Sequence, residues 1–140
     1  MAVSVSYRLD PQLKDRLAKR ARDEGISETT LVSRLLVEGL KTTAHPGIAY
    51  RDGAAGRRAG VAGGPDVWEV VVAARHTRKR GEAQVVAAAE QLDIPATLVR
   101  LAITFAAEHP AEITEMIKRN DAAAARAQRA VRERERFLAS

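Results

Sequence analysis

The sequence contains no cysteine, so the chain can form neither a disulfide nor a thiolate metal site. It has no apolar run near the roughly 20 residues that span a bilayer, and its N-terminus lacks the apolar core of a signal peptide. These absences disfavour a secreted or membrane-spanning protein, and we expect a cytoplasmic one. At 140 residues the chain has room for one or two small domains.

Sequence motifs of catalysis are missing as well. The three histidines, His45, His76 and His109, lie far apart and show no metal-ligand spacing. Neither a nucleophile elbow nor a paired-carboxylate motif is recognisable. Because His45 and His109 each precede a proline, we interpret them as a loop residue and a helix-boundary residue. The sequence therefore predicts no enzymatic activity, no cofactor and no metal site.

Positive charge is in modest excess, with a net charge of +5 and an isoelectric point near 10.1. Such a balance favours an anionic partner, and nucleic acid before a membrane. The excess is confined to the two ends. Residues 1–44 carry 8 basic and 6 acidic side chains, residues 45–121 carry 10 of each, and residues 122–140 carry 5 and 2. Because the excess is small, composition alone is a weak argument for DNA binding.

The first nine residues show the period-two alternation of a half-buried strand. Apolar Val3, Val5, Tyr7 and Leu9 alternate with polar Ser4, Ser6 and Arg8. Helical patterns follow directly, so the chain offers this strand no neighbour. A strand cannot satisfy its own backbone groups, and the simplest partner is the same strand of a second copy.

Two helices are predicted behind this strand. Asp10 and Pro11 form a strong helix start, and Gly25 is placed to end that helix in the left-handed conformation. Ser27 can cap the next helix, whose apolar residues run from Leu31 to Leu40 over a wide arc. A unit of roughly 40 residues buries too little surface to be stable alone. We therefore expect an obligate homodimer.

These residues resemble the ribbon-helix-helix family of bacterial repressors and antitoxins, in particular its CopG-like members. The resemblance is carried by residues 4–10, by Leu13 and Leu17, by Gly25-Ile26-Ser27 and by residues 31–36. It implies that two antiparallel strands enter the DNA major groove, where Ser4, Ser6 and Arg8 read base edges. It also implies that Ser27, Glu28 and Thr29 hold a phosphate at a helix N-terminus. Glu28 departs from the family pattern, because a carboxylate repels a phosphate. The alternative is that the polar side chains merely face solvent.

The middle of the chain predicts a short hairpin followed by helices. Glycines punctuate residues 42–65, and residues 48–51 and 57–61 are expected to be the two strands. Helices are expected from Val67, over residues 82–92 and over residues 96–108. The last two resemble a helix-turn-helix, but many small helical domains share that pattern, so a structural or partner-binding role remains open.

Residues 45–121 resemble a second bacterial family, antitoxins of the VapB type that are paired with PIN-like ribonuclease toxins. The most distinctive shared motif is Gly-Pro-Asp-Val-Trp at residues 64–68. The resemblance implies a small winged or homeodomain-like helical domain and a toxin as partner.

Pro110 predicts the start of a last helix. From Asp121 onward the chain is mostly alanine, arginine and glutamate, which favours a helix with little to bury that frays in solution. By resemblance to antitoxins, which neutralise toxins with a C-terminal segment, we assign toxin binding to the stretch from residue 117 to residue 138. Its contact residues would be Ile117, Ala124, Ala127, Val131 and Leu138. A solvated helix or a coiled coil is the alternative.

The sequence thus predicts a mainly α protein with a short N-terminal strand. Its expected parts are a ribbon-helix-helix dimerisation domain (1–44), a hairpin with a helix-turn-helix-like domain (45–120) and a helical tail (121–140). The predicted function is that of an antitoxin that represses its own operon by binding a palindromic operator on double-stranded DNA. The alternatives are a CopG-like repressor without a toxin and a protein-interaction adaptor.

Overall fold

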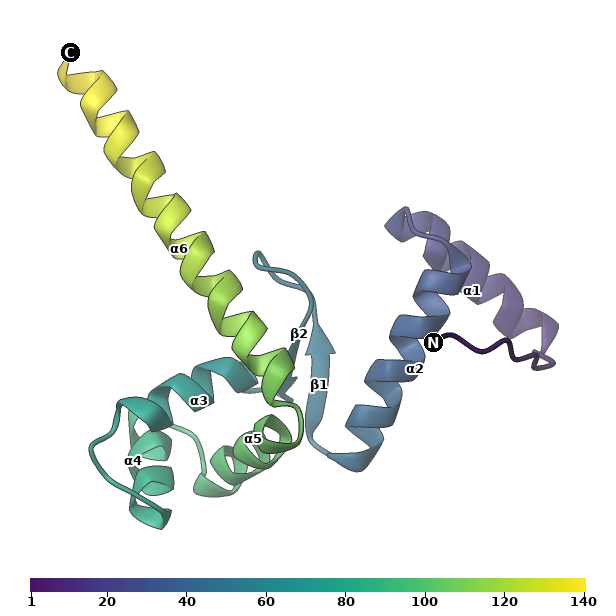
Figure 1. The fold of residues 1–140 in the computed structure, drawn as a ribbon, viewed down its shortest axis with the longest axis horizontal. Coiled ribbons are helices and arrows are strands. Elements are labelled where there is room, and N and C mark those ends of the chain that lie inside the picture. Colours follow the sequence, from purple (N-terminus) through teal and green to yellow (C-terminus); the bar gives the residue numbers. More distant parts are fainter. The chain divides into compact units, whose positions relative to one another are not determined.

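The computed structural model describes all 140 residues and is mainly helical, with six helices and one two-stranded antiparallel hairpin (Figure 1). This agrees with the predicted helical class and the predicted hairpin. The chain divides into two compact units, residues 1–44 and residues 45–140, and each is described by itself. None of the helices combines the length and the apolar character needed to cross a membrane.

The first unit contains α1 (Pro11–Glu24) and α2 (Glu28–Ala44), joined by a tight turn. The predicted helix signals are confirmed. The Asp10 carboxylate accepts a hydrogen bond from the Gln12 N–H at 2.8 Å, and Gly25 ends α1 in the left-handed region with φ 68°. The Ser27 Oγ accepts from the Thr30 N–H at the start of α2.

An ion pair fixes the end of α1 to α2. Both carboxylate oxygens of Glu24 accept hydrogen bonds from the Arg34 guanidinium, at 3.0 and 2.9 Å, and Arg20 donates a third. These bonds, with the Arg34 pair the larger contribution, lower the pKa of Glu24 to about 2. Little else closes the unit, because Ala21 and Leu31 are its only buried apolar residues.

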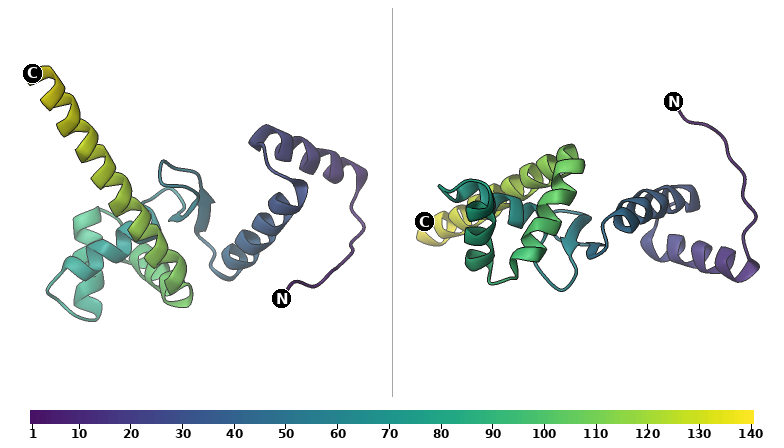
Figure 2. Two further views of the ribbon diagram at one scale, coloured as in Figure 1. Left: turned by 45° about the horizontal axis from the view of Figure 1, so that its top comes forward. Right: turned by 90° about the horizontal axis from the view of Figure 1, so that it is seen from below.

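Residues 1–10 precede α1 as an extended, exposed segment without regular secondary structure (Figure 2). The strand predicted over residues 3–9 is therefore not formed in the single chain. The physical reason is that a strand needs a hydrogen-bonding neighbour, and the chain's one sheet consists of the two strands of the hairpin. Pairing with a second copy stays a prediction.

The second unit begins with β1 (Ile48–Arg51) and β2 (Arg58–Val61), which pair in the register Ile48 with Val61 and Arg51 with Arg58. It continues with α3 (Val67–His76), α4 (Glu82–Leu92), α5 (Ala96–Glu108) and α6 (Pro110–Ala139). The predicted ranges 82–92 and 96–108 are confirmed. One apolar core joins the hairpin to α3, α4, α5 and the first turns of α6, with Phe105, Val70 and Val99 fully buried.

Helix α6 confirms the predicted helix start at Pro110 and continues into the segment that was expected to form a separate tail. It runs for 30 residues from Pro110 to Ala139 and passes through residues 120 and 121 without interruption (Figure 1). Its first turns are anchored in the core by Ile113 and Met116, which removes the cost of nucleating a new helix further along. Alanine, arginine and glutamate then propagate it at little cost. The structure therefore shows no boundary at residue 121.

Candidate functional site

The proposed base-reading residues lie in the extended N-terminal segment. Ser4, Ser6 and Arg8 are all exposed, and so are the apolar residues between them. Val3 and Tyr7, for example, are about four-fifths exposed. Exposing several apolar side chains in one segment to water is energetically unfavourable. The segment thus carries both an uncovered apolar row and a polar row that is free to make contacts.

The predicted phosphate contacts lie together at the beginning of α2. Ser27 precedes the helix, and Glu28 and Thr29 form its first turn. The Glu28 carboxylate is paired with the Lys14 ammonium of α1 at 2.7 Å. The Lys14 ammonium thus compensates the negative charge of Glu28. Sequence reasoning missed Lys14, since only the packing of α1 against α2 brings the two side chains together.

The first unit also leaves an apolar surface uncovered. A groove of about 440 Å³ is lined by leucines of both helices, namely Leu13, Leu17, Leu31 and Leu35, together with charged residues of α1. Leu36 and Leu40 lie one turn apart on α2 and are 56% and 74% exposed. Apolar exposure of this extent in so small a unit makes this face a candidate interaction surface.

In the second unit, the Asp66 carboxylate is the centre of a buried polar network. It accepts hydrogen bonds from the guanidinium groups of Arg51, at 2.9 Å, and Arg58, and from the Trp68 indole N–H at 3.1 Å. Burial acts to raise the pKa of Asp66, but the two arginines outweigh it and hold the pKa below its ordinary value. The network fastens both strands of the hairpin to the start of α3.

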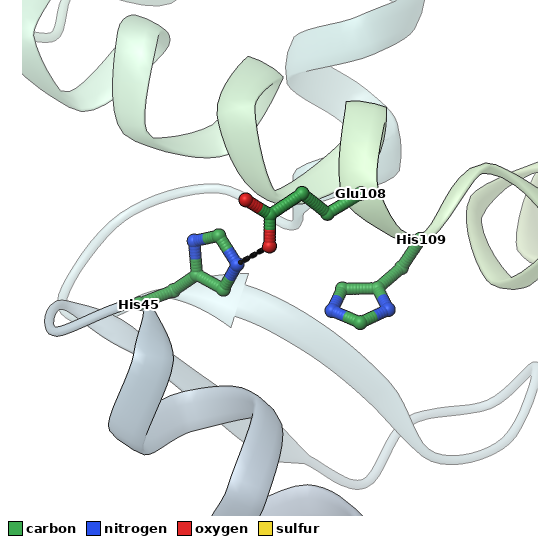
Figure 3. A group of neighbouring side chains, drawn as sticks. All are labelled: His45, Glu108 and His109. Atoms are coloured by element: carbon green, nitrogen blue, oxygen red, sulfur yellow. Dashed lines mark hydrogen bonds and ion pairs between the residues drawn. The ribbon is translucent and has the colours of Figure 1, made fainter.

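A second polar cluster brings together His45, Glu108 and His109 (Figure 3). The His45 ring is buried, and its Nε2 lies 2.6 Å from Glu108 Oε2, while the Glu108 side chain is 58% exposed. The ring centroids of the two histidines are 5.9 Å apart. The Phe105 ring packs against both, at 5.2 Å from His45 and 4.8 Å from His109.

Two of the three histidines, which are far apart in the sequence, lie together in the folded chain. His45 and Glu108 are 63 residues apart, and only the packing of α5 beside the hairpin joins them. His76, at the end of α3, lies outside the cluster and is exposed. Local spacing carries no signal of such a contact. The one shared feature in the sequence is that His45 and His109 both precede a proline.

The helix-turn-helix-like pair offers few free polar groups. The exposed polar residues of α5 include Thr97, Arg100 and Thr104. Arg100 forms an ion pair with Glu82 of α4, and this hydrogen bond lowers the pKa of Glu82. Arg100 is the only cationic residue of α5, and its charge is already paired with Glu82. The helix therefore has little positive charge available for contacts with DNA phosphates.

The predicted toxin-contact residues do not share one environment. Ile117 packs against the core of the second unit, whereas Ala124, Ala127, Val131 and Leu138 are exposed along α6. The far end of α6 also exposes Phe137, at 78%, next to Leu138. Sequence reasoning passed over Phe137, although an aromatic residue among arginines and glutamates is a signal of contact.

Comparisons with protein-family models, with curated proteins and with solved structures find no match for this chain.

Proposed function

We propose that the protein is a homodimeric DNA-binding repressor that acts as the antitoxin of a type II toxin-antitoxin system. In this proposal the N-terminal segments of two copies pair into a ribbon that binds a palindromic operator. The observation that carries it is the first unit, in which two helices bury only Ala21 and Leu31 behind a segment of alternating apolar and polar residues.

A second copy accounts for both uncovered features of the first unit. Two antiparallel segments would satisfy each other's backbone groups and turn their apolar rows to the same side. That side can then cover the groove lined by leucines between α1 and α2. A two-fold axis makes such an interface self-complementary, which is the commonest arrangement in oligomers.

The polar face of such a ribbon carries the groups that read DNA. A two-stranded ribbon fits the major groove, where an arginine can bind guanine with two hydrogen bonds and serine hydroxyls can bond several bases. The unpaired N–H groups at the start of α2 suit a phosphate, with Lys14 compensating Glu28. Arg8 is therefore the residue on which we expect sequence discrimination to depend most.

Replacing Arg8 by alanine tests this role. We expect affinity for a duplex carrying the DNA upstream of the protein's own coding sequence to fall by about 10- to 100-fold, because each bidentate base contact contributes about 1–3 kcal/mol. Affinity for a scrambled duplex of the same length should fall much less. Fluorescence anisotropy at several salt concentrations measures both.

Arg126→Ala is the charge-matched control, because Arg126 is exposed on α6 and its replacement removes the same positive charge as Arg8→Ala. It should leave the ratio of the two affinities unchanged. If the wild-type protein binds neither duplex, the adaptor alternative is favoured. If Arg8→Ala keeps the wild-type affinity ratio, the ribbon does not read the bases.

The toxin-binding part of the proposal concerns the far half of α6. Residues 122–140 carry five arginines and two glutamates, and Val131, Phe137 and Leu138 are exposed among them. An apolar stripe flanked by arginines fits a groove with an acidic border, such as the carboxylate-rich site of a PIN-like ribonuclease. A repressor without a toxin would have no need of this surface.

A chain that ends at Asn120 tests the tail. It keeps every buried residue of the core, so we expect it to fold and to bind DNA as the full chain does. It should no longer co-purify with the product of the neighbouring gene, and should no longer protect cells that express that product. Protection by the shortened chain would show that toxin binding lies elsewhere.

A further inference from the structure

The geometry points to a binding site for one divalent transition-metal ion at His45, Glu108 and His109. These side chains place two imidazole nitrogens and a carboxylate oxygen within 4.8 Å of one another. Zn²⁺ is bound in proteins by histidine nitrogen and carboxylate oxygen, and two histidines with one carboxylate is a known zinc ligand set. Mg²⁺ and Ca²⁺ prefer oxygen ligands, so two imidazoles argue against them.

The distances require only small movements. Two ligand atoms on a tetrahedral Zn²⁺ at about 2.0–2.1 Å are separated by roughly 3.3 Å. The distance between His45 Nε2 and Glu108 Oε2, now 2.6 Å, would therefore increase by less than an ångström. The widest distance between two ligand atoms, 4.8 Å, would have to decrease by more than an ångström. Glu108 is the ligand best able to adjust, because most of its side chain is exposed.

The backbone already holds both histidines in place. His45 opens a turn in which the Ile48 N–H donates to the His45 carbonyl at 3.1 Å, with Gly47 at φ 102°. A side chain at Gly47 would also collide with Leu101. His109 lies between α5 and α6, and its N–H donates to the Phe105 carbonyl at 3.0 Å. A metal site gains affinity when its ligands are fixed before binding.

The surroundings leave one side of the cluster free for a further ligand. The nearby carboxylate of Glu112 is bonded by the Tyr50 hydroxyl at 2.7 and 2.9 Å, so it is engaged elsewhere. The Phe105 ring packs against both histidine rings. Solvent reaches the cluster on the side of Glu108, where a water molecule can complete a four-coordinate ion.

Titration of the full-length protein with Zn²⁺ tests the site. We expect one Zn²⁺ ion per chain by calorimetry and a higher melting temperature that a chelator reverses. When Co²⁺ is added in place of Zn²⁺, we expect the visible absorption bands of a four- or five-coordinate Co²⁺ ion. In NMR spectra the ring signals of His45 and His109 should shift on Zn²⁺ addition, whereas those of His76 should not.

Variants distinguish Zn²⁺ binding at this cluster from nonspecific Zn²⁺ binding by any exposed histidine. We expect Glu108→Gln and His109→Ala to weaken Zn²⁺ binding at least about tenfold, because loss of even an outer partner of a metal ligand costs about 10- to 100-fold. Both positions are at least partly exposed, so these variants should fold even if His45→Ala does not. His76→Ala is the matched control, since it removes a histidine outside the cluster and should bind as the wild type does.

Two results would overturn the inference. One is wild-type affinity for Zn²⁺ in both Glu108→Gln and His109→Ala. The other is absence of a stoichiometric Zn²⁺ complex in the wild-type protein, which would reduce the cluster to a hydrogen-bonded contact between His45 and Glu108. Neither result depends on DNA or toxin binding, so the proposed repressor function is tested separately.

Discussion

Replacing Asp66 by asparagine is expected to lower the free energy of unfolding of the second unit by about 3 kcal/mol. The change removes one negative charge from between the guanidinium groups of Arg51 and Arg58 and leaves them without a compensating partner. Breaking a buried ion pair costs about 3–5 kcal/mol, and the lower end applies here because both arginines reach solvent in part.

Urea denaturation followed by fluorescence and by circular dichroism measures this loss. Trp68 is the only tryptophan of the chain and lies in the same network, so circular dichroism checks that the fluorescence change reports unfolding. Asp52→Asn is the matched control. Asp52 also pairs with an arginine, Arg57 at 3.3 Å, but its side chain is 72% exposed, so we expect a loss of at most about 1 kcal/mol.

The same network predicts a dependence on pH. The pKa of Asp66 is lower in the folded chain than in the unfolded one, so the unfolded chain binds this proton more readily. Its contribution to stability is complete above the ordinary Asp pKa of about 3.9 and is lost as the pH falls below it. The stability difference between the wild-type protein and Asp66→Asn should therefore shrink with acidification. A difference that is independent of pH would contradict the role of the carboxylate charge.

The second large effect is expected at the uncovered apolar face of α2. Replacing Leu36 and Leu40 by serine should raise the dimer dissociation constant at least about 1,000-fold. Burying a leucine contributes about 1.5–3 kcal/mol, and two-fold symmetry removes four leucines from the interface. Both side chains are more than half exposed in the single chain, so the substitutions remove no buried contact from within the unit itself.

Sedimentation equilibrium and light scattering measure the assembly. Val86→Ser is the control, because Val86 is an exposed apolar residue of α4 in the other unit and lies outside the proposed interface. A dimer that survives the double substitution would place the interface on another surface. A wild-type protein that is monomeric at all concentrations would rule out the paired ribbon.

Local sequence signals were enough to predict an element when residues within that element determine where it starts or ends. The start of α1 follows from Asp10 and Pro11, its end from Gly25, and the hairpin from the glycine-rich stretch between two short apolar runs. Each of these signals acts within a few residues, through a side-chain cap or a permitted backbone conformation. They could therefore be read without any knowledge of packing.

Features that join distant residues could not be predicted in this way. His45 meets Glu108, and Arg51 and Arg58 meet Asp66, only because the hairpin packs beside α3 and α5. The continuity of α6 also depends on its anchoring by Ile113 and Met116, which the composition of the tail does not reveal. The N-terminal strand is a further case, because its expected partner belongs to another chain.

The continuity of α6 has a consequence for the thermodynamics of the proposed toxin binding. Leu138 lies about 33 Å along the helix axis from Met116, the last buried residue, at 1.5 Å per residue. A partner can therefore enclose the tip without displacing any side chain of the core. Because the tip is already helical, association does not have to order it, and less conformational entropy is lost than with a disordered tail. In the proposed complex, the tip of α6 would thus bind as a preformed helix and would not have to fold upon the toxin.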